Sequence, residues 1–173
     1  MKKIIQLLIL LITCMNLNAQ MIPLEDLQNL VKNDDVSELV NIMRDLGYNL
    51  EHIKNANAGE KGLSVPAKVV YWSYNCRLDK DLDKWMVDMD KFWGYVRLIK
   101  KENGKTILDF TVNINFGNEY VKNIDKSLRL QGFQAHTELD EKSNSIFTYY
   151  TKDDYNYTII IEQTRVDYTI YIK

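Results

Sequence analysis

The feature that most constrains the fold is a helix end that occurs twice, as Gly47-Tyr48 and again as Gly132-Phe133. Before each glycine, apolar residues recur at spacings of three and four, which places them on one face of a helix. Glycine readily adopts the left-handed conformation that ends a helix, and an aromatic residue after it can fold back onto the last turn. Strand-like sequence follows each joint. We therefore predict two tandem units, each a helix followed by antiparallel strands.

Three helices are predicted. A short opening helix spans Pro23–Asn33, with the proline near its first turn. The helix of the first unit spans Val36–Leu46, and either Asp34 or Asp35 can cap it. The helix of the second unit spans Asn118–Gln131, with Asn118 as its cap.

Strands are predicted where β-branched and aromatic residues dominate. The predicted strands are Val65–Cys76, Gly94–Lys101, Thr106–Ile114, Phe133–Leu139, Ile146–Thr151, Tyr155–Gln163 and Asp167–Lys173. The stretch Asn55–Ser64 is a predicted loop, in which Gly59 and Gly62 need no special backbone conformation. The segment Arg77–Trp93 fits a helix or a strand, and we favour a helix at Asp81–Asp90.

Asn103-Gly104 lies between two strand-like runs, which is a strong signal for a β-hairpin. Counting outward from a two-residue turn gives the predicted pairs Ile99–Leu108, Arg97–Phe110 and Tyr95–Val112. The residues predicted to face the core are then Leu108, Phe110, Val112 and Ile114. Those predicted to face outward are Asp109, Thr111 and Asn113.

The first residues form a predicted signal peptide. Lys2-Lys3 precedes the apolar run Ile4–Ile12, and small residues up to Ala19 complete the pattern. The apolar run is shorter than the roughly 20 residues that span a bilayer. We therefore expect removal of residues 1–19 and export to the periplasm or the extracellular space. The alternative is a weak lipobox, in which Cys14 becomes lipidated and holds the protein on a membrane surface.

The mass of the protein isolated from its native envelope tests this processing. We expect a mass corresponding to Gln20–Lys173. A diacylated N-terminus at Cys14 would contradict the prediction and favour the lipoprotein.

Composition narrows the classes of function. The chain has 22 basic and 24 acidic side chains and no basic run, which argues against a nucleic-acid surface. No segment after the signal peptide is long and apolar enough to cross a membrane. After cleavage Cys76 is the one cysteine left, so no intramolecular disulfide can form, and we expect a buried, unreactive thiol. The units 20–115 and 116–173 are expected to associate in one compact domain.

No catalytic, metal or cofactor site is predicted. His52 and His136 each follow a joint, but no motif surrounds them. In the run Asp79–Asp83 every second residue is an aspartate, as in a calcium-binding loop, and Asp90 falls at the twelfth position of such a loop. Lys84, however, occupies the position at which that loop needs glycine. We interpret the run as the solvated start of a helix. No serine lies in a nucleophile motif.

Aromatic residues are the group with most potential for binding. They are too numerous for one face of a small sheet, so some should lie on an outer surface, where rigid rings can bind a protein, a peptide or a sugar. The alternative is that they pack beneath helices and shield strand edges. The candidate binding residues are Trp72, Tyr74, Trp85, Trp93, Tyr149, Tyr157 and Tyr171.

Several of these features together resemble small secreted proteins of Bacteroidota type. They are the exported start, the Leu-rich opening helix, the two helix–Gly–aromatic joints, the Tyr-rich run Tyr71–Tyr74 and the Tyr/Ile tail. The resemblance covers nearly the whole mature chain, but that group has no established activity and supplies no catalytic residue. The tandem layout is also similar, in topology alone, to the β-lactamase-inhibitor-protein architecture.

The predicted fold class is α+β: two tandem helix-plus-antiparallel-β units, with the helices on one face of a shared sheet or of two abutting sheets. The predicted function is that of an exported, non-enzymatic binding module, and an inhibitor or immunity protein would be a narrower version of it. The partner would be a protein, peptide or glycan of the envelope. The alternative is an envelope hydrolase that uses acidic residues and His136.

Overall fold

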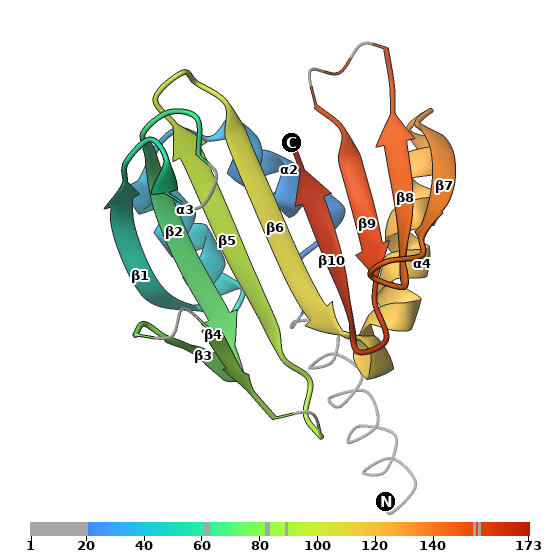
Figure 1. The fold of residues 1–173 in the computed structure, drawn as a ribbon, viewed down its shortest axis with the longest axis horizontal. Coiled ribbons are helices and arrows are strands. Elements are labelled where there is room, and N and C mark those ends of the chain that lie inside the picture. Colours follow the sequence, from blue (N-terminus) through green and yellow to red (C-terminus); the bar gives the residue numbers. More distant parts are fainter. Residues whose placement is uncertain (1–20, 61–62, 82–83, 89, 154, 156) are drawn as a thin grey trace, which may run out of the picture.

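The computed structural model describes residues 21–173 except 61–62, 82–83, 89, 154 and 156. In that part of the chain, three helices cover one face of an eight-stranded antiparallel sheet, and a two-stranded hairpin lies over the other face (Figure 1). The fold class is therefore α+β, as predicted. The predicted signal peptide lies outside the described residues.

The large sheet is a single sheet, not two abutting ones. In pairing order its strands are β1 (Asn49–Ala56), β2 (Ala67–Tyr74), β5 (Gly94–Lys101), β6 (Thr106–Asn113), β10 (Asp167–Ile172), β9 (Ile159–Gln163), β8 (Ser145–Thr151) and β7 (Gln134–Asp140). The central pair, β6 and β10, joins strands from the two halves of the sequence. The separate hairpin consists of β3 (Cys76–Asp79) and β4 (Lys84–Val87).

The helices are α2 (Leu24–Lys32), α3 (Val36–Asp45) and α4 (Ile114–Leu130). Asp35 caps α3, as one of the two predicted candidates, because its carboxylate accepts the N–H of Ser37 at 2.8 Å. All three helices turn apolar residues toward the sheet, which explains their amphipathic sequences.

The two helix–Gly–aromatic joints have the same local geometry. Gly47 has a φ of 83° and Gly132 a φ of 86°. In each joint the glycine N–H donates to the carbonyl three residues earlier, and the aromatic N–H donates to the carbonyl five residues earlier, at 2.9–3.0 Å. This pair of bonds defines the Schellman motif. Tyr48 and Phe133 are both buried, so each joint fixes the strand that follows it.

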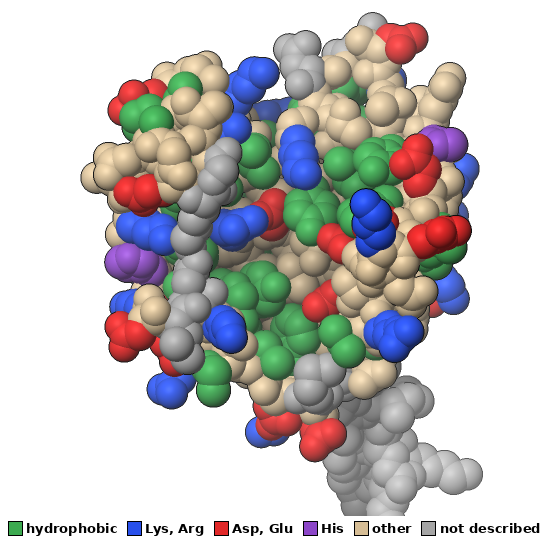
Figure 2. Space-filling view, in the orientation of Figure 1, with side chains coloured by type: hydrophobic (Ala, Val, Ile, Leu, Met, Phe, Trp, Pro, Cys, Tyr) green, Lys and Arg blue, Asp and Glu red, His purple; other side chains and the backbone are tan. Residues whose placement is uncertain are grey.

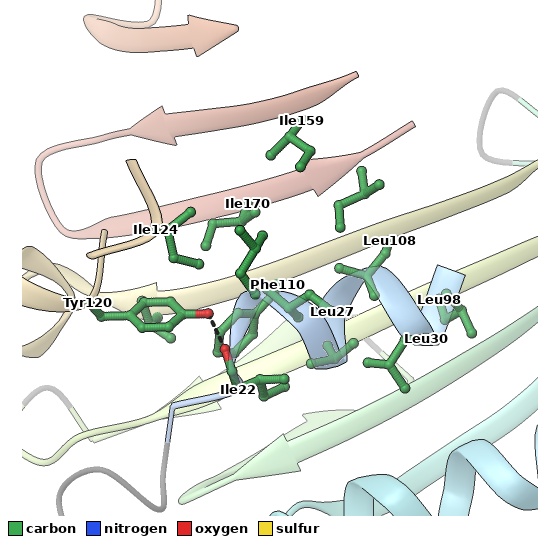
Figure 3. Packing of buried hydrophobic residues seen from close by; sticks show 14 of the residues in the cluster. Ile22, Leu27, Leu30, Leu98, Leu108, Phe110, Tyr120, Ile124, Ile159 and Ile170 are labelled. Carbon is green, nitrogen blue, oxygen red and sulfur yellow. Dashed lines mark hydrogen bonds between the residues drawn. The ribbon is translucent and has the colours of Figure 1, made fainter. Parts of the chain in front are cut away.

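The main core lies between the helices and the sheet (Figure 3). Phe110, on the central strand β6, is fully buried, with its ring edge-on to Tyr48 at 6.2 Å and to Tyr120 at 5.8 Å between centroids. The Tyr120 hydroxyl donates a 2.5 Å hydrogen bond to the carbonyl of Ile22, which ties α4 to the chain before α2 (Figure 3).

Helix α4 begins at Ile114, four residues before the predicted start, so Ile114 does not extend β6 and Asn118 is not the cap. The Asn118 side chain instead accepts a hydrogen bond from the Tyr168 hydroxyl at 2.5 Å. A Cβ on Gly117 would lie 2.8 Å from the Tyr168 ring and 3.0 Å from Val112. Glycine there allows the first turn of α4 to lie directly on the sheet.

The predicted register of β5 and β6 is wrong by one residue. The hydrogen bond that closes the loop joins the N–H of Lys101 to the carbonyl of Lys105, so the loop has three residues, and Gly104 has a φ of 80°. A type I turn followed by a left-handed residue has this form. As a result Arg97 pairs with Asp109, not with Phe110.

The side of β6 that was predicted to face outward is also buried. Leu108, Phe110 and Val112 face the helices, as predicted. The alternate residues Asp109, Thr111 and Asn113 lie on the opposite face of the sheet, yet none is more than 4% exposed when the whole residue is counted. They lie in the middle of a wide sheet, where neighbouring strands and the β3–β4 hairpin exclude solvent.

The predicted helix at Asp81–Asp90 is wrong, because that segment contains strand β4 and part of the turn before it. The β3–β4 hairpin buries Leu78 and half-buries Trp85 in a second cluster, together with Val69 and Tyr71 of β2. Tertiary packing therefore decides its structure, not local periodicity.

Three smaller differences concern strands and loops. Strand β1 occupies a stretch for which no strand was predicted, and β9 begins at Ile159 instead of Tyr155. Gly59 has a φ of 90°, so it does adopt a conformation that favours glycine, contrary to the prediction. Gly62 lies outside the described residues.

Candidate functional site

The face of the sheet opposite the helices carries a pocket of about 220 Å³ near the middle of the strands. In the space-filling view this face is hollowed there, with apolar, basic and acidic side chains close together (Figure 2). Strands β2, β5, β6 and β10 form its floor, and the β3–β4 hairpin forms one wall.

That wall is aromatic. Trp85 of β4 stacks on Tyr95 of β5, with 4.4 Å between ring centroids and 12° between planes. Tyr71 of β2 lies 6.3 Å from Trp85, and Trp93 stacks on Tyr95 at 6.0 Å. Period-two alternation places Tyr71 on this face, because its neighbour Trp72 faces the helices. The rings of Trp85, Tyr95 and Trp93 are therefore nearly parallel, and Tyr71 is tilted by 53° from Trp85.

The floor contains a charge pair. Arg97 Nε donates to Asp109 Oδ2 at 2.7 Å, and Arg97 Nη2 contacts the same oxygen. The arginine side chain is 40% exposed and the aspartate 6%. Burial tends to lower the pKa of Arg97, but the adjacent Asp109 carboxylate outweighs that effect and raises it. The other carboxylate oxygen, Oδ1, is buried without a hydrogen-bond partner among the described residues.

Hydroxyl groups complete the floor. Thr111 and Thr169 share a buried hydrogen bond of 2.9 Å between their hydroxyls. The Tyr171 hydroxyl donates a hydrogen bond to Glu162 at 2.6 Å. Burial and the nearby Glu162 carboxylate both raise the pKa of Tyr171. Lys173 lies over the Tyr171 ring, with its ammonium 4.6 Å from the centroid.

The registers place the pocket in the middle of a row of side chains that crosses all eight strands. Each member pairs directly with the next across one strand boundary. The row is His52, Tyr71, Arg97, Asp109, Tyr171, Ile160, Tyr149 and His136. A histidine stands at each end, and a tyrosine stands next to each histidine.

The structure brings two of the seven candidate aromatic residues into the pocket, Trp85 and Tyr171. Trp93 does not line the pocket but stacks on Tyr95, which does. Tyr149 lies farther along the row, 6.4 Å from the Phe147 ring. The remaining three lie on the helix side of the sheet.

Trp72 is fully buried in the main core. Tyr74 packs against the Tyr48 ring, 5.7 Å away. The Tyr157 hydroxyl accepts a hydrogen bond from Gln28 of α2 at 3.2 Å. These three side chains hold the helices to the sheet.

The two histidines lie on opposite edges of the sheet, His52 on β1 and His136 on β7. His136 is exposed and lies 3.0 Å from Glu138, whereas His52 stacks on Tyr71 at 6.4 Å. The predicted helix start at Asp79–Asp83 is instead the end of β3 and its turn, with Asp83 outside the described residues. Within the described ranges, no three acidic, histidine or cysteine side chains gather in a way that could hold a metal ion.

Seven pocket residues were not among the candidates: Tyr71, Leu78, Tyr95, Arg97, Asp109, Thr111 and Thr169. Alternation from the buried positions of β2 and β6 does place Tyr71 and Asp109 on the open face. Arg97 and Asp109 pair only in the correct hairpin register. The two-residue turn assumed from the sequence gave a register shifted by one residue, in which Arg97 pairs with Phe110.

Cys76 lies near the pocket, with its thiol 3.4 Å from the carbonyl of Gly94. Burial raises the pKa of the thiol to about 12 from its ordinary value of 9.0. At pH 8 the folded protein should therefore hold about a thousandfold less thiolate than the unfolded chain. We expect iodoacetamide to label Cys76 slowly in buffer and rapidly in urea. Equal labelling rates in the two conditions would contradict this environment.

No family model, curated protein or solved structure matches the chain. Among the helices of the described residues, none is long and apolar enough to span a membrane. The site must therefore be interpreted from its own chemistry.

Proposed function

We propose that the protein is an exported, non-enzymatic binding module whose recognition surface is the open face of the eight-stranded sheet. The observation that carries the proposal is the pocket on that face, in which aromatic rings adjoin the Arg97–Asp109 pair. Stacked aromatic rings and arginine are the side chains that dominate binding energy at protein surfaces. An inhibitor or immunity protein is a narrower version of the same function.

We further propose that the domain consists of two tandem units, α3 with β1, β2, β5 and β6, and α4 with β7, β8, β9 and β10. The matching Schellman joints support this division. So does the strand order, in which the last strand of each unit pairs with that of the other. The boundary then falls close to the start of α4.

The row across the open face gives independent support for the tandem units. His52 pairs with Tyr71 and His136 pairs with Tyr149, at corresponding places in the two units. His52 stands five residues after its glycine and His136 four residues after, and the register shift between Leu50 and His52 accounts for the extra residue. The pocket then lies where the two units meet, which is a common place for binding sites.

Site-specific photo-crosslinking tests the binding face. The exported protein carries p-benzoylphenylalanine at Tyr149 on the open face or, as a matched control, at Leu130, which is 79% exposed on α4. After irradiation in the native envelope, we expect an adduct from position 149 that Trp85→Ala abolishes, and none from position 130. Equal adducts from both positions, or none from position 149, would contradict the proposed face.

A further inference from the structure

The pocket is small, polar at its floor and aromatic at one wall, and these properties restrict what it can hold. Its volume of about 220 Å³ is below the roughly 300–1,000 Å³ of sites that enclose drug-sized ligands. One ring-sized group is therefore the natural occupant. The planar indole of Trp85 in this wall suits a ring whose face is apolar, and the Tyr71 ring lies beside it at a tilt of 53°.

The floor needs a ligand that both donates and accepts hydrogen bonds. Asp109 Oδ1 is a buried acceptor without a partner among the described residues. Arg97 directs Nε and Nη2 to the other carboxylate oxygen, and its Nη1 has no hydrogen bond in the described part of the chain. A guanidinium can only donate, and a carboxylate can only accept. Neighbouring hydroxyl groups satisfy both, because each hydroxyl donates one hydrogen bond and accepts others.

The charge pair selects against ionic ligands. An anion would draw Arg97 away from Asp109 and leave a carboxylate that is 6% exposed without its counter-ion. A cation would compete with Arg97 for the same carboxylate. Either outcome separates a partly buried ion pair, which is unfavourable. An apolar side chain of a partner would cover the wall but leave the floor groups unpaired.

We propose that this pocket binds one uncharged sugar ring of a glycan, with the apolar face of the ring against Trp85 and adjacent hydroxyls on Arg97 and Asp109. The inference rests on the proposed binding function and names the ligand class for that site. Thr111 and Thr169 also line the pocket, and their hydroxyls can donate a hydrogen bond to a further sugar hydroxyl or accept one from it.

NMR titration of the mature protein with methyl glycosides of glucose, galactose, mannose and N-acetylglucosamine tests the inference. We expect at least one of these sugars to bind with millimolar affinity, as one small ring in a shallow site should. It should shift the Trp85 indole N–H and the Arg97 Nε–H resonances and leave the buried Trp72 indole unmoved. Methyl glucuronide and glucosamine, which are charged, should bind more weakly.

Three variants make the test specific. Trp85→Ala should weaken the affinity about tenfold by removing the planar indole from the wall. Asp109→Asn should weaken it by removing the negative charge and one of the two acceptor oxygens. Met86→Ala is the matched control, because Met86 is the next residue on β4 and is 51% exposed. It should bind as the unaltered protein does.

Two outcomes would overturn the sugar assignment: no shift at Trp85 and Arg97 with any of the four neutral glycosides, or tighter binding of the charged sugars. Crosslinking of a protein partner from position 149 together with either outcome would retain the binding function and reject the ligand class. Absence of both crosslinks and sugar shifts would reject both.

Discussion

Replacing Phe110 by alanine should destabilise the protein by about 3–5 kcal/mol, the usual range for removing a buried phenylalanine from a core. The side chain is fully buried on the central strand β6, and its ring lies edge-on to Tyr48 and Tyr120. Both tyrosines are themselves buried, so the surrounding core can collapse only in part around the cavity. The expected fall in melting temperature is about 10 °C.

Urea unfolding followed by circular dichroism measures this loss. Leu130→Ala is the control, because Leu130 is 79% exposed, and it should change the free energy of unfolding by less than about 0.5 kcal/mol. The m-value should stay the same in both variants, since the surface exposed on unfolding is unchanged. A Phe110→Ala loss as small as that of Leu130→Ala would mean that β6 does not lie at the centre of the core.

The parts of the fold that the sequence predicts are those that local chemistry determines. A glycine followed by an aromatic residue after an amphipathic run leaves few alternatives to a helix end, and both joints are confirmed. Asp35 as a cap and the core side of β6 follow from equally local rules.

The errors occur where distant contacts decide the structure. Trp85 favoured a helix by its spacing, yet it lies in a short strand that is held against the sheet through contacts with Tyr71 and Tyr95. Strand β1 shows no clean alternation, because it has an irregular register and lies at the sheet edge with Leu50 and Ile53 partly exposed.

The candidate site depends on register, and only two of its side chains, Trp85 and Tyr171, were predicted as binding residues. Asn-Gly predicted the hairpin correctly, but its loop has one more residue than the shortest turn. A shift of one residue moves every side chain of a strand relative to its partner. That shift separates Arg97 from Asp109, so the charge pair at the floor becomes apparent only once the loop is known.

Replacing both Gly47 and Gly132 by alanine should destabilise the protein by about 2–4 kcal/mol, with about 1–2 kcal/mol from each site. Both residues have φ near 85°, where a side chain is disfavoured. The added Cβ would lie no closer than 3.5 Å to Tyr74 at the first site and 3.8 Å to Lys152 at the second. These are ordinary contact distances, so the loss should come from backbone conformation and not from a clash.

Two sets of variants separate that cause from a general intolerance of substitution. Asp45→Ala, two residues before Gly47, and Gln131→Ala, directly before Gly132, change exposed positions and should be nearly neutral. Gly47→Asn and Gly132→Asn should lose less than the alanine variants, because asparagine tolerates positive φ better. Other loop glycines are unsuitable as neutral controls, since Gly59 and Gly104 also have positive φ.

Thermal and urea unfolding of the single variants also tests the tandem units. Two joints with the same hydrogen bonds and the same buried aromatic residue should lose equal stability, within about 0.5 kcal/mol. A large loss at one glycine and none at the other would mean that the joints are not equivalent parts of two units. Equal losses of stability at the two glycines, together with tolerance of asparagine at both, would support equivalent joints. Each set of four strands would then begin with a residue that must adopt a positive φ.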